Sequence, residues 1–186
     1  MPESLKENEL LKLLNTDSSR VIADLICDAV DKNPELFGSL VQMSFNQPYP
    51  AGMRAARAIQ IYCLEKPDVM IPYLEEIITN ILESKTEGIR RNYLQVLAQK
   101  IDLNILEEPG SLISQCFDWL ADSKVKPATR IYAAEVIKKF CNQEPDLKRE
   151  LIDVLEFAME ECPVSLRGRG RKILAALSKP QDRNKK

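Results

Sequence analysis

The sequence predicts an all-α protein built as a stack of repeated helix pairs. Three observations lead to this fold class: the composition, a set of prolines that precede apolar runs, and a set of arginines at nearly constant spacing. The chain has 186 residues, of which 45% are hydrophobic, 29% are charged and only six are glycine. This composition favours long helices over the turn-rich pattern of a β-sandwich, and the length allows a substantial shared core.

Four prolines each stand directly before an apolar run with helical periodicity. Proline has no amide hydrogen and a preset φ, so it fits the first turn of a helix. Each of these prolines is therefore expected to begin the first helix of a repeat, called helix A below. They are Pro34, Pro67, Pro109 and Pro145.

A second helical run follows each proline after 20 to 23 residues and starts with an arginine. The residues seven and ten positions after the arginine are mostly apolar and share one helix face. The arginines are therefore expected to open the second helix of each repeat, called helix B. They are Arg54, Arg90, Arg130 and Arg167, with Arg20 opening a similar run near the start.

The second repeat fits this pattern least well. Six residues after the arginine, the other repeats have Ile or Val, whereas the second repeat has Gln60. The third repeat has one exception of its own, Lys100, at the tenth position. We therefore expect the second B helix to be the least regular of the series.

This arrangement resembles a HEAT repeat, in which a proline often opens helix A and a small or apolar residue plus arginine opens helix B, as in Met53-Arg54 and Leu166-Arg167. The resemblance implies a right-handed α-solenoid of about five antiparallel helix pairs. One pair cannot bury its apolar stripe alone, so stacking supplies the core. We expect a single domain over residues 1–178 and a disordered basic tail over 179–186. The expected repeats are 5–33, 34–66, 67–108, 109–144 and 145–178.

Charge is distributed unevenly between the two kinds of helix. The B segments of the last four repeats carry 13 Lys and Arg against three acids, while the A segments with their turns carry 14 acids against five bases. If B helices line the concave face, as the resemblance implies, that face is basic and attracts an acidic partner. The residues expected to bind it are Arg57, Arg91, Lys138, Lys139, Arg169, Arg171 and Lys172.

The leading arginines of the B helices have a different interpretation. A cation is disfavoured at a helix N-terminus, so helix electrostatics does not explain their position. In HEAT repeats this arginine commonly contacts carboxylates in its own or the next repeat. The resemblance therefore implies a structural role for Arg20, Arg54, Arg90 and Arg130.

The sequence contains few residues suited to catalysis or to metal binding. It has no histidine, which removes Ser-His-Asp and Cys-His nucleophiles and histidine metal sites. Asp24, Asp28 and Asp31 are interpreted as a solvated helix face, and Trp119 as a core residue. We expect no catalytic residue, metal, cofactor or small-molecule substrate. The cysteines, which are expected in the core, are Cys27, Cys63, Cys116, Cys141 and Cys162.

The leading functional hypothesis is a non-enzymatic adaptor or scaffold that binds an acidic protein segment through a basic concave face. The alternative is nucleic-acid binding, because bacterial DNA alkylation-repair glycosylases have a similar HEAT-like fold. Those enzymes use a concave-face aspartate with aromatic residues. The B helices here offer Tyr62, Tyr93 and Tyr132 but only Asp102, at a helix end. A third possibility, a phycobilisome-lyase-like enzyme or chaperone, has no support beyond the fold.

The sequence also leads to an expected location in the cell. The N-terminal segment is amphipathic and acidic, unlike a secretory signal, and no run approaches 18 apolar residues. We therefore expect a cytoplasmic protein without membrane association.

Overall fold

The computed structural model describes residues 7–142, 144–160 and 164–179. In these ranges the regular secondary structure is entirely helical, with ten α-helices and two short 3-10 helices. The all-α fold predicted from the sequence is therefore confirmed. The chain divides after Asp102 into two compact units, called the N-terminal half and the C-terminal half below, and each is described by itself. The single stack through both halves stays a prediction. Residues 180–186 of the expected tail lie outside the described residues.

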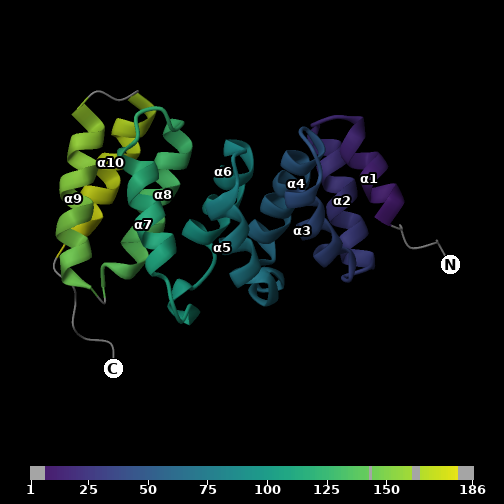
Figure 1. The fold of residues 1–186 in the computed structure, drawn as a ribbon, viewed down its shortest axis with the longest axis horizontal. Helices are drawn as coiled ribbons and strands as arrows, with labels where there is room; N and C mark the ends of the chain where they lie inside the picture. The colour runs from purple at the N-terminus through teal and green to yellow at the C-terminus, as the bar shows by residue number, and fades with distance from the viewer. Residues whose placement is uncertain (1–6, 143, 161–163, 180–186) are drawn as a thin grey trace. The chain divides into compact units, whose positions relative to one another are not determined.

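The N-terminal half contains three successive helix pairs in two layers (Figure 1). In one layer α2 packs on α4 and α4 packs on α6, and in the other α1 contacts α3 and α3 contacts η1. The helices α2, α4 and α6 correspond to the predicted B helices. The elements are α1 (Glu7–Thr16), α2 (Arg20–Lys32), α3 (Leu36–Asn46), α4 (Ala51–Glu65), η1 (Pro67–Tyr73), α5 (Leu74–Glu83) and α6 (Glu87–Gln99).

The C-terminal half contains two helix pairs with the same layering. The A helices α7 and α9 contact each other, the B helices α8 and α10 contact each other, and each A helix packs on the B helix that follows it. Trp119 is buried here, as predicted. The elements are η2 (Leu103–Ile105), α7 (Gly110–Ala121), α8 (Pro127–Phe140), α9 (Pro145–Glu160) and α10 (Val164–Leu177).

The prolines mark the starts of the A helices with one correction. Pro145 is the first residue of α9 and Pro109 is the N-cap of α7, while α3 begins two residues after Pro34. Pro67 opens a 3-10 helix instead of an α-helix. The reason is Pro72, which has no N–H to give the carbonyl four residues back and whose ring clashes with it. The α-helix of this repeat therefore starts only at Leu74.

The predicted starts of the B helices were wrong by three residues in four of the five repeats. The helices α4, α6, α8 and α10 begin at Ala51, Glu87, Pro127 and Val164, so the arginine is their fourth residue. Only Arg20 is the first residue of its helix. In α8 the sequence contained the correct start signal, because Pro127 stands at the first helical position.

The B helices bury the residue six positions after the arginine, with α4 as the exception. Of the predicted seventh positions, Leu97 and Ile137 are buried, while Cys27, Ile61 and Leu174 are half-buried. The residues six positions after the arginine are fully buried in four repeats: Ile26, Val96, Val136 and Ile173. In α4 the buried side chains are instead Ala55, Ala58, Ile59, Tyr62 and Cys63. As a result Ile61 and Leu64 are only half-buried, and Gln60 donates from Nε2 to Oε1 of Gln95 at 3.0 Å.

Candidate functional site

The seven basic residues predicted to bind a partner all lie on B helices and all retain contact with solvent. In the N-terminal half Arg57 is on α4 and Arg91 on α6, both half-buried. In the C-terminal half Lys138 and Lys139 occupy the last turn of α8, half-buried. The remaining three are on α10: Arg169 is half-buried, while Arg171 and Lys172 are exposed.

Arg57 and Arg91 lie on the same side of the helix pair α4 and α6. Met53 is the nearest side chain to Gly88, and Gln60 is hydrogen-bonded to Gln95, so the two helices run parallel with an offset of 35 residues. Each arginine lies one turn before the glutamine of its own helix, and residues three or four apart share a helix face. The structure therefore brings two of the predicted residues together on one surface.

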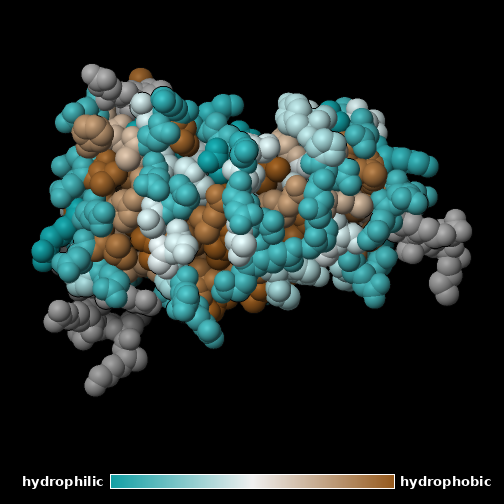
Figure 2. All heavy atoms as spheres, viewed as in Figure 1, coloured by the Kyte–Doolittle hydropathy of each residue, from teal (hydrophilic) through white to brown (hydrophobic). Residues whose placement is uncertain are grey.

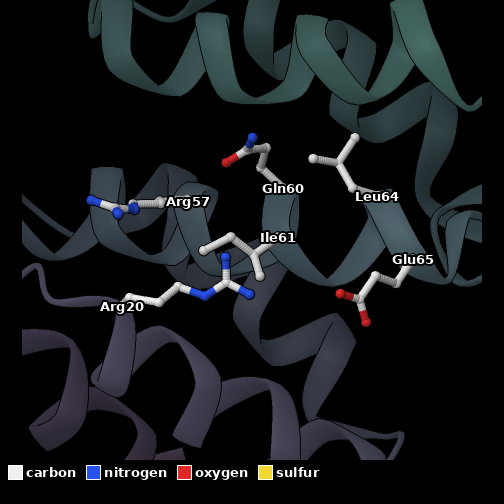
Figure 3. Close-up of a pocket in the computed structure, with 6 residues that line it drawn as sticks. All are labelled: Arg20, Arg57, Gln60, Ile61, Leu64 and Glu65. Atoms are coloured by element: carbon white, nitrogen blue, oxygen red, sulfur yellow. The ribbon is translucent and has the colours of Figure 1, made fainter.

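Arg57 also borders a hollow between α2 and α4. Its Nη1 donates to the Ser18 carbonyl oxygen at 3.1 Å, in the turn that leads into α2. The hollow has a volume of about 310 Å³. In Figure 3, Arg20 reaches from α2 towards Ile61 of α4. The lining residues are Arg20, Arg57, Gln60, Ile61, Leu64 and Glu65.

Arg169 is held against α8 by two neighbours. Its Nη2 donates to Glu135 Oε1 at 2.6 Å, and its guanidinium lies 5.0 Å from the centroid of the Tyr132 ring. Burial opposes the charged form of Arg169, but the hydrogen bonds with Tyr132 and Glu135 outweigh it and raise the pKa of the guanidinium. Arg169 therefore already serves to join α8 and α10, unlike the exposed Arg171 and Lys172.

Two leading arginines contact helix C-termini, partners that the sequence did not predict. The expected carboxylate contact is partly seen at Arg54, whose charge, after the hydrogen bonds with Ser19, helps to lower the pKa of the Asp17 carboxyl. Arg54 Nη1 donates to the Leu14 carbonyl at 2.9 Å, in the last turn of α1. Arg130 donates from Nε to the Leu120 carbonyl at 2.9 Å and from Nη2 to the Ala158 carbonyl at 3.4 Å. Carbonyls in the last turn of a helix lack intrahelical partners and carry partial negative charge, which a guanidinium stabilises. The arginine thus acts as a C-cap for A helices.

The expected carboxylate contact occurs at Arg20. Its Nε lies 2.7 Å from Asp24 Oδ1, one turn ahead on the same helix, and both side chains are exposed. Asp31 on that helix accepts a hydrogen bond from Tyr62 Oη at 2.7 Å and another from Lys66. The hydrogen bonds from Lys66 and then Tyr62 hold the pKa of the Asp31 carboxyl below its usual range. The aspartates of α2 are all exposed, as the sequence predicted.

The described residues contain no group of three or more potential metal ligands of the His, Cys, Asp and Glu types. Cys63, Cys116 and Cys141 are buried and Cys27 is half-buried, whereas Cys162 lies outside the described residues. Burial raises the pKa of the Cys27 thiol to about 11 and that of Cys63 to about 12. These thiols are therefore protonated near neutral pH, which makes them poor nucleophiles.

The surface of the described part of the chain is mixed in polarity. On the face seen in Figure 2, hydrophilic side chains predominate and apolar groups appear between them. Among the helices that the structure describes, none has the length and apolar character needed to cross a membrane.

Comparison with known proteins gives a family but no close relative. A family model described as a HEAT repeat domain matches residues 10–177. No curated protein and no solved structure gave a significant match to the chain. The helix pairs and the family match therefore agree with each other over nearly the whole chain.

Proposed function

The chain belongs to the HEAT repeat family, and on that basis we propose that it is a non-enzymatic scaffold whose B helices bind an acidic segment of a partner protein. In this proposal α4 and α6 form the acidic-partner surface of the N-terminal half, and α8 and α10 form that of the C-terminal half, each considered by itself. The residues that bind it are Arg57, Arg91, Lys138, Lys139, Arg169, Arg171 and Lys172.

The observation that carries the proposal is the sorting of charge between the A and B helices of the last four repeats; α2 departs from it, with three acids against two bases. Within their observed bounds, α4, α6, α8 and α10 carry 11 Lys and Arg against three acids, namely Glu65, Glu87 and Glu135. The A helices α3, α5, α7 and α9 carry nine acids against two bases. A surface with one sign of charge attracts and orients a partner of the opposite sign.

Within this set, Arg169 makes the smallest contribution in our proposal. Its guanidinium is already paired with Glu135 and stacked near Tyr132, so a ligand carboxylate has to compete with these contacts. Arg57, in contrast, has a single hydrogen bond to a backbone carbonyl and five N–H donors in total. Arg57 is therefore a better candidate than Arg169 for a direct contact with the partner.

The burial of the B-helix tyrosines favours a protein partner over single-stranded nucleic acid. Proteins that bind single strands without sequence preference stack the bases on accessible aromatic rings. The B-helix tyrosines Tyr62, Tyr93 and Tyr132 are buried, with exposed fractions of 9%, 0% and 8%. These rings are accordingly unsuited to base stacking, and they are also unsuited to holding a flipped base as a glycosylase does.

A binding assay with a charge-reversal variant tests the proposal. The probe is a fluorescent peptide of alternating Glu and Ser, and the variant combines R57E, R91E, K138E and R171E. Four solvent-exposed ion pairs contribute about 2 kcal/mol together at low salt, so the variant is expected to bind about 30-fold more weakly. Affinity should also fall as salt is added.

The matched control replaces four exposed basic residues outside the B helices, which gives the same change in net charge. The control variant combines K12E, K85E, K124E and R149E. It should keep affinity within about threefold of the unchanged protein. Equal losses in the two variants would mean that only net charge matters. A preference for DNA or RNA of matched charge over the peptide would replace the proposed partner with nucleic acid.

A further inference from the structure

The hollow between α2 and α4 combines half-buried aliphatic side chains with an arginine. Its floor contains Ile61 and Leu64, both half-buried, and Arg57 lies on one side. At the positions equivalent to Leu64, the residues Val30, Phe140 and Leu177 are all buried. The second repeat thus leaves Leu64 half-buried where three other repeats bury an apolar residue and the third repeat has the exposed Lys100. Ile61 is half-buried, as are its equivalents Cys27 and Leu174.

The cause is a change in which face of α4 packs inward. The buried face consists of small residues, Ala55 and Ala58, together with Ile59 and Tyr62. Gln60 is turned towards α6, where it is hydrogen-bonded to Gln95. Because Ile61 and Leu64 are three residues apart, they lie together on the remaining side of the helix. Water contact with such aliphatic surface is unfavourable, and a ligand that covers it gains binding energy.

Charges at the two ends of the hollow give it a direction. Arg57 is at one end of the lining stretch of α4 and Glu65 is at the other, beyond Leu64 (Figure 3). A carboxylate of a partner is attracted at the Arg57 end and repelled at the Glu65 end. Arg20, which also lines the hollow, is already paired with Asp24. The arrangement favours an acidic group at Arg57 and an aliphatic group over Ile61 and Leu64.

The spacing of these residues sets the spacing of the groups on an extended partner. From Arg57 to Ile61 the helix rises by roughly 6 Å, at about 1.5 Å per residue. Two residues of an extended strand span about 6.6 Å, and their side chains point to the same side. We infer that this hollow is the specificity site of the basic surface and that it takes an acidic residue and an aliphatic residue two positions apart in the partner. This inference rests on the proposed function.

The test uses peptides derived from the alternating Glu and Ser probe. In the first, the central Glu is replaced by Leu, so that Leu has a Glu two residues away on both sides and on the same face of the strand. In the second, the central Glu is replaced by Ser, which makes the same change in charge without an aliphatic group. In the third, a Ser next to the central Glu is replaced by Leu, which places Leu on the opposite face. We expect the first peptide to bind at least fivefold more tightly than the second.

Variants of the hollow complete the test. L64Q and I61Q, examined singly, should each remove most of the gain in affinity that leucine gives. Neither should change the binding of the unsubstituted Glu and Ser probe. V21Q is the matched control, because Val21 is an exposed aliphatic residue on α2 outside this hollow, and it should keep the gain. Helicity and melting temperature establish that each variant is folded.

The outcomes separate this inference from the proposed function. The unsubstituted Glu and Ser probe can bind while leucine gives no gain in affinity, or the gain can survive in both L64Q and I61Q. In either case the hollow is not a specificity site and the scaffold proposal stands. The third peptide keeps every Glu, so its gain in affinity is measured against the unsubstituted probe. An equal gain there would also overturn the inference, because it would show that a leucine on either face suffices. If none of the peptides binds, both the inference and the proposed function fail.

Discussion

The helices α4 and α10 are both B helices of the same family, yet they use similar residues in different ways. In α4, Arg57 and the aliphatic pair Ile61 and Leu64 border a hollow that is accessible to a ligand. In α10, Arg169 is held by Glu135 and Tyr132 of the neighbouring helix. The comparison teaches that a basic residue on a B helix becomes a binding group or a structural group according to what the neighbouring helix presents to it.

The largest effect is expected at the buried Arg130 of the C-terminal half. Its side chain is 4% exposed and donates to carbonyls near the ends of two A helices. Replacing it with alanine leaves carbonyl groups without these donors, and we expect a loss of about 3 kcal/mol in the free energy of unfolding. Urea unfolding followed by circular dichroism measures this. R149A, at an exposed site in the same half, should change it by less than about 0.5 kcal/mol. Equal effects would exclude the C-cap role.

A pair of glycines distinguishes the packed side of α4 from the exposed side of α10. A Cβ at Gly52 would lie 2.6 Å from the Gln47 carbonyl oxygen and 2.9 Å from that of Ser44. Since backbone atoms cannot move aside readily, G52A is expected to lower the free energy of unfolding by about 2 kcal/mol. A Cβ at Gly168 meets nothing within 4 Å, so G168A should raise it by about 1 kcal/mol through helix propensity. Thermal unfolding measures both changes in stability. If G52A and G168A shifted the stability in the same direction, this packing would be contradicted.

Arg169 and Arg57 allow the opening comparison to be tested directly. R169Q loses the ion pair with Glu135 and the contact with Tyr132, and we expect it to lower the free energy of unfolding by about 1 kcal/mol. R57Q loses one hydrogen bond to an exposed carbonyl, so its stability should change by less than about 0.5 kcal/mol, while binding of the acidic probe weakens. Melting curves measure the stability of both variants, and fluorescence anisotropy measures their binding of the acidic probe. If R169Q weakened binding without lowering stability, the distinction between the two arginines would be wrong.

The smallest effect concerns the ionisation of Asp31, which joins α2 to α4. Its pKa is lowered by Lys66 and Tyr62, so the carboxylate stabilises the folded state above its ordinary pKa of about 3.9. This stabilisation is lost as the pH falls through the lowered value, because the protonated form no longer attracts Lys66. In K66M the pKa should rise towards the ordinary value. An NMR titration of the Asp31 carboxyl would contradict this pairing if the two proteins titrated alike.

The sequence predicted the helical repeat well because proline and apolar periodicity act locally. The placement of Pro109 and Pro145 and the burial of Ile26, Val136 and Ile173 follow from such local rules. The partners of Arg54 and Arg130 could not be predicted in this way. They include main-chain carbonyls at the ends of other helices, which leave no sign in the residue types.

The hollow at α4 was only indirectly visible in the sequence. Gln60 at a position otherwise held by Ile or Val indicated an irregular repeat, but not which side chains would become accessible. That depends on the small residues Ala55 and Ala58, which let another face of α4 pack inward. The pairing of Arg169 with Glu135 was likewise missed, because the two residues are 34 positions apart and meet only when α8 and α10 are packed together. The sequence shows the charge of a residue, but it does not show whether a neighbouring helix already engages the side chain.

The central claim is that an acidic protein segment binds to the B helices, and mapping that contact by NMR tests it most directly. The isotope-labelled protein is titrated with the alternating Glu and Ser peptide at low salt. We predict that backbone amide shifts concentrate on α4 and α6 around Arg57 and Arg91, and on the exposed basic parts of α8 and α10. Shifts confined to the A helices or to the aspartates of α2, or no shifts at all, would contradict the account.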